Sequence, residues 1–193
     1  FPTRRSSDLL MKIAGENGVA AYGAVMYVNF IFVATFLGYA IGCAPVISYH
    51  YGAGNHAELK NLYKKSMSII LVWGVILFGA AQLLAPVLSK IFVGYNTGLY
   101  AMTLHGFRVY AIAFLIIGIN IFGSSFFTAL NNGLISAVIS FLRTLVFQVI
   151  MVLTLPLWFG INGIWSAISI AEALTLIMTT TFFVRQKDKY HYL

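Results

Sequence analysis

The chain has 193 residues, of which 60% are hydrophobic and 9% are charged, and its mean hydropathy is +0.88. Soluble domains carry about 25% charged residues, so this composition excludes a soluble globular protein and indicates an integral membrane protein. The formal net charge of +7 does not indicate nucleic-acid binding, because the lysines and arginines lie between apolar segments, where they face anionic lipid headgroups.

The first 21 residues differ from the rest of the chain. Residues 1–9, FPTRRSSDL, resemble a sequencing-library adapter translated into protein, and we exclude them from the fold. Residues 10–21 combine Lys12 and Glu16 with Gly15 and Gly18, which predicts a polar connector after a helix that is missing. We therefore expect this chain to be the C-terminal part of a longer protein.

The remaining sequence predicts an all-α membrane protein with a bundle of about five transmembrane helices. A hydrocarbon core of ~30 Å needs roughly 20 apolar residues, and the segments that qualify are 22–48, 66–88, 109–130, 134–158 and 161–184. The short links at 131–133 and 159–160 make the last three helices antiparallel neighbours. Within the first span, Ala34, Gly38 and Gly42 share one face and predict close approach by another helix. Together these spans form a lobe over 22–185.

The lysines and arginines orient the bundle. One side of the membrane holds six of them: Lys60, Lys64, Lys65, Arg185, Lys187 and Lys189. The other side holds three: Lys12, Lys90 and Arg108. The positive-inside rule places the six-charge side, with the tail 186–193, in the cytoplasm. If the intact protein also begins there, an odd number of helices precedes residue 10.

Two ionisable residues lie inside the predicted spans. Arg143 is ~14 Å and Glu172 ~18 Å from the cytoplasmic ends of their helices, so their depths are nearly equal. Charges at this depth are costly unless they pair or face water. Two interpretations of Glu172 stay open: a structural ion pair with Arg143, or a proton or cation site.

Two amides inside the spans have similarly open roles. Asn120 and Gln148 either line a cavity for a transported compound or form hydrogen bonds to a neighbouring helix. The sequence has no HExxH, GxSxG or P-loop motif, and Cys43 is its single cysteine. We therefore predict that the chain is not an enzyme, with no catalytic residues, no metal site and no cofactor.

The end of the first span resembles a motif of the multidrug and toxic compound extrusion (MATE) family. The segment is Ala44-Pro45 followed by Ser48-Tyr49-His50-Tyr51-Gly52-Ala53-Gly54-Asn55, which is similar to the end of the eighth helix in that family. The helix-end residues are Pro45, Tyr49, Tyr51, Gly52 and Gly54. Later landmarks follow the family's order: 125–130 (SFFTAL), Leu142-Arg143, Pro156, 163–167 (GIWSA) and Glu172, where the family often has an acid. The resemblance implies helices eight to twelve of twelve.

The resemblance also implies a function. Such a protein exports small amphipathic cationic drugs by alternating access, in exchange for Na⁺ or H⁺, and its partners are membrane lipid and its own N-terminal lobe. Family members with a cation site in this lobe carry acids in the seventh and tenth helices, but residues 111–130 contain none. The coupling site is therefore expected outside this fragment. The family implies a bacterial inner membrane.

Two other functions stay open. A flippase for lipid-linked precursors from the same superfamily would share the architecture but would need a strongly basic cavity, whereas Arg143 is the only cation deep in these spans. A membrane scaffold subunit without transport activity would use every interior polar residue for packing.

Overall fold

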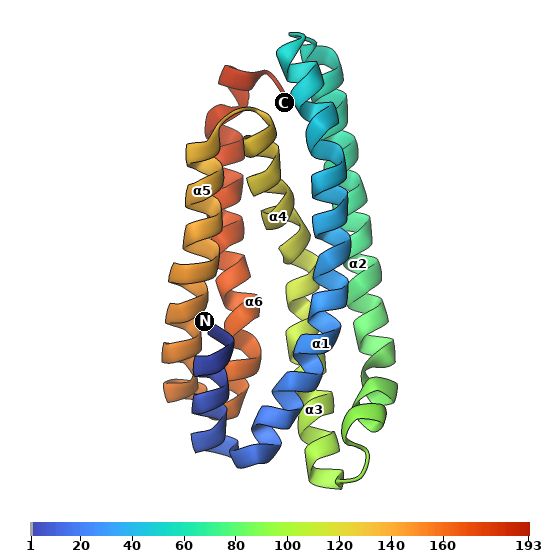
Figure 1. Cartoon of the computed structure of the whole chain (residues 1–193), viewed down its shortest axis with the longest axis vertical. Helices are drawn as coiled ribbons and strands as arrows, with labels where there is room; N and C mark the ends of the chain where they lie inside the picture. The colour runs from blue at the N-terminus through green and yellow to red at the C-terminus, as the bar shows by residue number, and fades with distance from the viewer. Residues whose placement is uncertain (1) are drawn as a thin grey trace.

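The computed structural model describes the backbone of residues 2–193 and the side chains of residue 16 and residues 18–193. Every regular element in this part of the chain is helical (Figure 1). The elements are α1 (Pro2–Gly52), α2 (His56–Val93), α3 (Thr97–Tyr110), the 3₁₀ turn Ala111–Ala113, α4 (Phe114–Ala129), α5 (Gly133–Phe141), the π-helical turn Leu142–Phe147 and α6 (Gln148–Tyr190).

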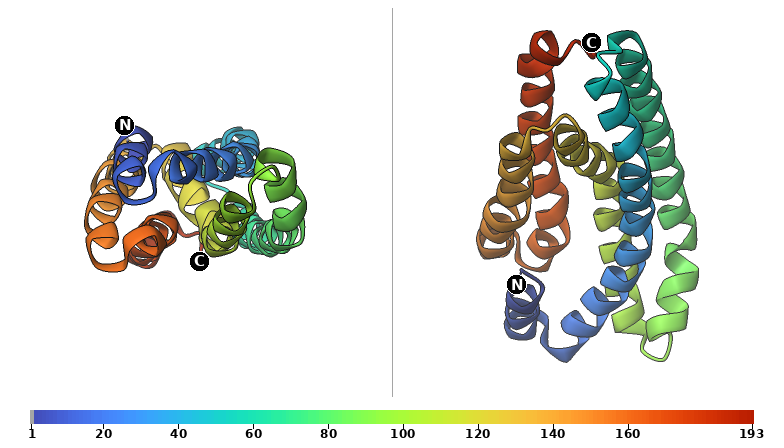
Figure 2. Two further views of the ribbon diagram at one scale, coloured as in Figure 1. Left: turned by 90° about the horizontal axis from the view of Figure 1, so that it is seen from below. Right: turned by 45° about the horizontal axis from the view of Figure 1, so that its top comes forward.

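Four helical runs are long and apolar enough to cross a membrane: Gly18–Gly52, His56–Val93, Thr97–Ala129 and Gly133–Tyr190. The last run has 58 residues and breaks at Gly160, where φ is +56° and the backbone leaves the helical region. The chain reverses there, so this run forms a hairpin (Figures 1 and 2). The predicted all-α transmembrane bundle is confirmed, and the predicted fourth and fifth spans are the two arms of this hairpin.

The helices extend beyond the predicted apolar spans. α1 includes residues 10–21, where we predicted a polar connector, and α6 continues to Tyr190 within the predicted tail. α2 and α3 likewise begin at His56 and Thr97, ahead of the predicted spans 66–88 and 109–130. A helix satisfies its own backbone hydrogen bonds, so polar residues at its ends require no loop. The adapter origin of residues 1–9 stays a prediction, and their side chains lie outside the described residues.

The helix-end motif of α1 forms the turn into α2. The Asn55 N–H donates to the carbonyl of His50 (2.9 Å) and the Gly54 N–H to the carbonyl of Tyr51 (3.1 Å). Gly54 has φ +68°, so these bonds close a Schellman motif with glycine in the left-handed position. Asn55 then caps α2, because its side chain accepts a hydrogen bond from the Glu58 N–H.

The turn from α4 into α5 repeats this geometry without glycine. The Asn132 N–H donates to the carbonyl of Phe127 (2.8 Å) and the Asn131 N–H to that of Thr128 (2.9 Å). Asn131 takes the left-handed position at φ +58°, and Asn132 caps α5 through the Ile135 N–H. Asparagine tolerates this conformation better than other residues with a side chain.

These two turns give a matched test. We expect Gly54→Ala to destabilise the protein by about 1 kcal/mol, because a left-handed backbone costs an ordinary side chain about 1–2 kcal/mol. Gly54→Asn should cost less, since Asn131 already occupies the equivalent position. Thermal unfolding of the purified protein in detergent checks the order glycine, asparagine, alanine; equal stabilities for the two variants would contradict it.

α4 lies at the centre of the bundle. It packs against α1, α2, α5 and α6, and Figure 2 shows it between the α1–α2 side and the hairpin. At Gly118 a Cβ would collide with the ring of Phe36 and lie 2.8 Å from Ile70 Cγ2, so only glycine permits this approach. The predicted packing face is wrong for the described chain, because nothing lies within 4 Å of a Cβ added at Gly38 or Gly42.

The C-terminal residues pack against the same end of the bundle as the two turns (Figure 1). Tyr192 is fully buried, its hydroxyl donates to the carbonyl of Phe183 (2.9 Å), and its ring centroid lies 5.0 Å from that of Phe126. The hydroxyl of Tyr190 accepts from Asn132 Nδ2 (2.9 Å). These contacts join α4, α5 and α6 at one end.

Burial raises the pKa of Tyr192 above its ordinary value of 10.0, and the neighbouring Tyr63 and Tyr190 add to this effect. The unfolded chain therefore ionises at lower pH than the folded protein. The stability that this phenol contributes is complete below about pH 10 and is lost as the pH rises through its folded pKa. The free energy of unfolding, measured across this pH range, should fall less steeply with pH in Tyr192→Phe than in the wild type. Equal slopes in the two proteins would contradict the raised pKa of Tyr192.

Candidate functional site

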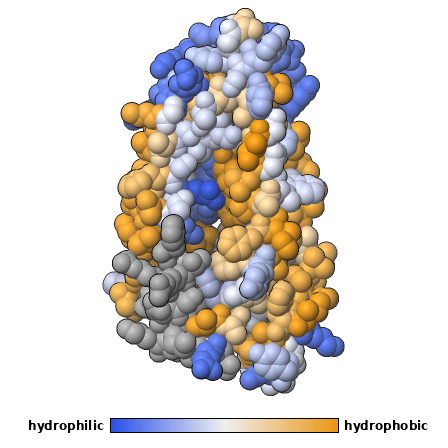
Figure 3. All heavy atoms as spheres, viewed as in Figure 1, coloured by the Kyte–Doolittle hydropathy of each residue, from blue (hydrophilic) through white to orange (hydrophobic). Residues whose placement is uncertain are grey.

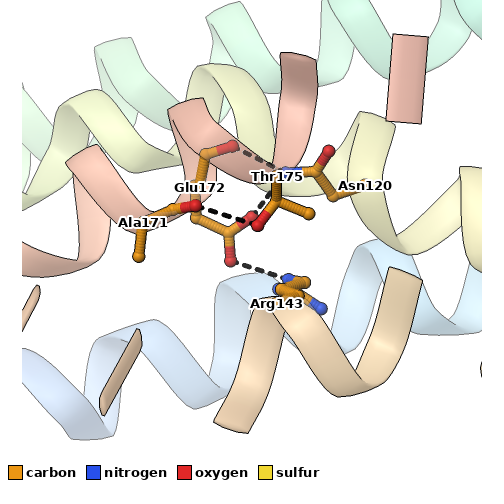
Figure 4. A network of polar contacts seen from close by, with 5 residues as sticks. All are labelled: Asn120, Arg143, Ala171, Glu172 and Thr175. Carbon is orange, nitrogen blue, oxygen red and sulfur yellow. Dashed lines mark hydrogen bonds and ion pairs between the residues drawn. The ribbon is translucent and has the colours of Figure 1, made fainter. Parts of the chain in front are cut away.

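The two ionisable residues of the spans form an ion pair between the arms of the hairpin. Arg143 Nε donates to Glu172 Oε1 at 2.8 Å, and 23% of the Arg143 side chain and 6% of the Glu172 side chain are exposed (Figure 4). Arg143 lies in the π-helical turn Leu142–Phe147, a local departure from the α-helix of a kind frequent at functional sites. The pair thus links the first arm of the hairpin, residues 133–159, to the second arm, residues 161–190.

Asn120 reaches the same carboxylate from α4. Its Nδ2 donates to Glu172 Oε2 (2.7 Å) and to the Glu172 main-chain carbonyl (3.0 Å), and the residue is fully buried. Both carboxylate oxygens are therefore engaged, one by a charged donor and one by an amide (Figure 4). Asn120 Oδ1 is buried without a hydrogen-bond partner among the described residues.

A cluster of four hydroxyls lies between α4 and α5, on the side of this network that faces the α4–α5 turn. Ser124 Oγ is 2.9 Å from Ser136 Oγ and 2.7 Å from Ser140 Oγ, and Thr128 Oγ1 donates to Ser136 Oγ at 2.7 Å. Ser136 and Ser140 were not among the predicted site residues. The sequence feature that could have predicted them is their spacing of four residues, which matches the spacing of Ser124 and Thr128.

Positions spaced by one helical turn connect the hydroxyls to the ion pair. On one face of α4 the polar residues are Asn120, Ser124 and Thr128, and along the first arm of the hairpin they continue from Ser140 to Arg143. Residues three and four apart share one face of a helix. The seam between α4 and α5 is therefore polar from the α4–α5 turn to the ion pair of Arg143 and Glu172.

The other predicted site residues lie elsewhere. Gln148 is half-buried, and its side chain makes no hydrogen bond within the described part of the chain. Pro45 and Tyr49 are exposed on α1, and the ring of Tyr51 packs against that of Tyr190 at 5.6 Å. Gly52 ends α1. In residues 16 and 18–193, no three His, Cys, Asp or Glu side chains are placed to hold a metal ion.

The ion pair and the amide give a direct stability test. Glu172→Gln should destabilise the protein by roughly 3 kcal/mol, the lower end of the range for breaking a buried pair, because it leaves Arg143 uncompensated while part of that side chain still reaches solvent. Adding Arg143→Gln should restore much of the loss. A double-mutant cycle on thermal unfolding measures the coupling; additive losses would show that the two charges do not interact.

Charges and amides inside an apolar helical bundle are rare and often mark transport pathways in membrane proteins. Residues 7–154 match the MatE family model, so the chain belongs to the MATE family of transporters. This confirms the resemblance seen at the end of α1. No curated protein sequence matches the chain.

Solved structures show the same fold. An outward-facing multidrug resistance MATE family transporter of the MOP superfamily matches with a TM-score of 0.89 at 19% identity, over 100% of this chain and 43% of that one. A MATE protein in complex with MaL6 matches with a TM-score of 0.89 at 19% identity, over 100% and 44%. A MOP superfamily transporter from Pyrococcus furiosus, described as having a binding pocket of reverse polarity, matches with 0.86 at 19% identity, over 96% and 42%. The chain therefore spans less than half the length of these transporters.

Proposed function

We propose that this chain is the C-terminal lobe of an exporter that moves small amphipathic cationic compounds outward by alternating access. One observation carries the proposal. The bundle matches an outward-facing and an inward-facing MATE transporter equally well, each with a TM-score of 0.89. A lobe whose fold fits both states supports rocking of one rigid bundle against another, which is the usual motion of secondary transporters.

The partners follow from the surface and from the length of the chain. Large apolar side chains are exposed along several helices, as expected where helices contact lipid: Phe30, Ile31, Leu83, Ile91, Leu157 and Trp158. The chain spans 43% of the outward-facing transporter, so a first lobe of the same protein would complete the substrate path. We place the C-terminus in the cytoplasm of a bacterium, with the bundle in the inner membrane.

We further propose that export is driven by Na⁺ or H⁺ and that the driving ion binds in the other lobe. Glu172 is the single acid that the described residues place in the middle of the membrane, and Arg143 and Asn120 already engage both of its oxygens. An ion would have to displace a guanidinium from this carboxylate. The geometry favours the structural role of Glu172.

The two alternative functions have less support. A flippase needs several cations in its cavity, and Arg143 is the only Lys or Arg deep in the described spans. A scaffold subunit would use the interior polar groups for packing, but it does not account for the match of the same bundle to an outward-facing and an inward-facing transporter.

The proposal predicts export by the full-length protein. Expressed in a bacterial strain that lacks its main efflux pumps, it should lower ethidium accumulation severalfold relative to cells with an empty vector. Removing the Na⁺ gradient or the H⁺ gradient separately should abolish the effect in one case and identify the driving ion. Unchanged accumulation of ethidium and of other cationic dyes would contradict the proposal and favour the scaffold.

A further inference from the structure

The guanidinium of Arg143 keeps most of its hydrogen-bonding capacity free. It uses Nε for Glu172, and its two Nη groups have no partner among the described residues. Almost a quarter of the side chain is exposed, whereas the carboxylate of Glu172 is nearly enclosed. A molecule that approaches this site therefore meets donor groups of the arginine and not the acid.

One face of the bundle beside α5 is hollowed. Figure 3 shows a hollow on the face between α5 and α1, with weakly polar residues along one side, apolar residues along the other and hydrophilic atoms on its floor. The hydroxyl cluster contributes exposed groups at Thr128 and Ser140, and Ser140 lies one turn before Arg143. Charged and hydroxyl donors thus lie beside an apolar wall.

This combination fits one kind of ligand group. Arginine presents its N–H groups as a planar fork that matches the two oxygens of a carboxylate. We propose that the hollow recognises the carboxylate of an amphipathic transported compound, with the Nη groups of Arg143 as donors, the hydroxyls of Ser124 and Ser140 as secondary donors and the apolar wall holding the hydrophobic part. The inference rests on the proposed export function and assigns recognition of the substrate's carboxylate to Arg143.

The neighbouring Glu172 supports this selectivity. It balances the charge of Arg143 without occupying the Nη groups, so the site has little net charge. A simple anion gains little there, whereas a carboxylate attached to an apolar or cationic body gains directed hydrogen bonds and apolar contact together. Selectivity therefore depends on the two Nη groups of Arg143 and on the hydrogen bond from Nε to Glu172, which orients them.

The test compares two dyes that differ in one group. Rhodamine B carries a free carboxylate on a cationic aromatic body, and its ethyl ester masks that carboxylate. Fluorescence anisotropy with the purified full-length protein gives the ratio of the two dissociation constants. Arg143→Gln/Glu172→Gln removes both charges together, and we expect it to lower the preference for the free carboxylate about tenfold, the value of one charge-assisted hydrogen bond.

A second variant protects the test against misfolding. Ser124→Ala/Ser140→Ala leaves the ion pair intact and should reduce the preference by about threefold, since neutral hydrogen bonds contribute less. Ile139→Val is the matched control, because Ile139 is a fully buried residue of α5, and this variant should keep the wild-type ratio of the two dissociation constants. An unchanged ratio in both site variants overturns the inference, including the case in which a carboxylate from elsewhere in the protein already occupies Arg143. Failure of the wild type to export ethidium would instead overturn the export function and leave this binding result standing.

Discussion

Hydrocarbon does not solvate charge, and this constraint determines how the hairpin is built. Arg143 and Glu172 lie at similar depth on its two arms and compensate each other at 2.8 Å. The reversal at Gly160 brings the arms together, and Asn120 from α4 completes the set of donors around the carboxylate. Sliding one arm along the other would leave a charge unpaired, so the network also fixes the register of the hairpin against α4.

Packing around α4 depends on small residues because lipid offers no hydrophobic drive between helices. Gly118 admits the ring of Phe36 from α1, and Gly123 admits Thr179 from α6. Hydrogen bonds then cross the same contacts, as from Ser125 to the carbonyl of Ala40. α4 therefore couples the α1–α2 side to the hairpin, and Asn120 of the polar network lies between these two glycines in the sequence of α4.

The sequence predicted the spans and the shared depth of Arg143 and Glu172, because absence of charge and helical rise are local properties. It did not predict the helix ends, since polar residues fit either a loop or a helix at the membrane surface. The hydroxyl cluster also escaped prediction. Serine and threonine often bond their own helix, as Thr154 does to the carbonyl of Ile150, and only the tertiary structure shows that Ser124 and Ser140 meet.

Contacts at two levels of the bundle hold α4, α5 and α6 together. At the C-terminal end of the bundle, Tyr190 and Tyr192 tie α6 to the start of α5 and to α4, and nearer the middle the ion pair and Asn120 tie the same elements again. Helices fixed at two heights cannot tilt independently. In the proposed alternating-access cycle, the lobe would therefore move as one body, and the geometry of the donors around Arg143 would stay the same while the side from which they are reached changes. A site preorganised in this way would lose little affinity to reordering during that cycle, so release of a bound compound would have to come from the proposed first lobe or from the entry of water.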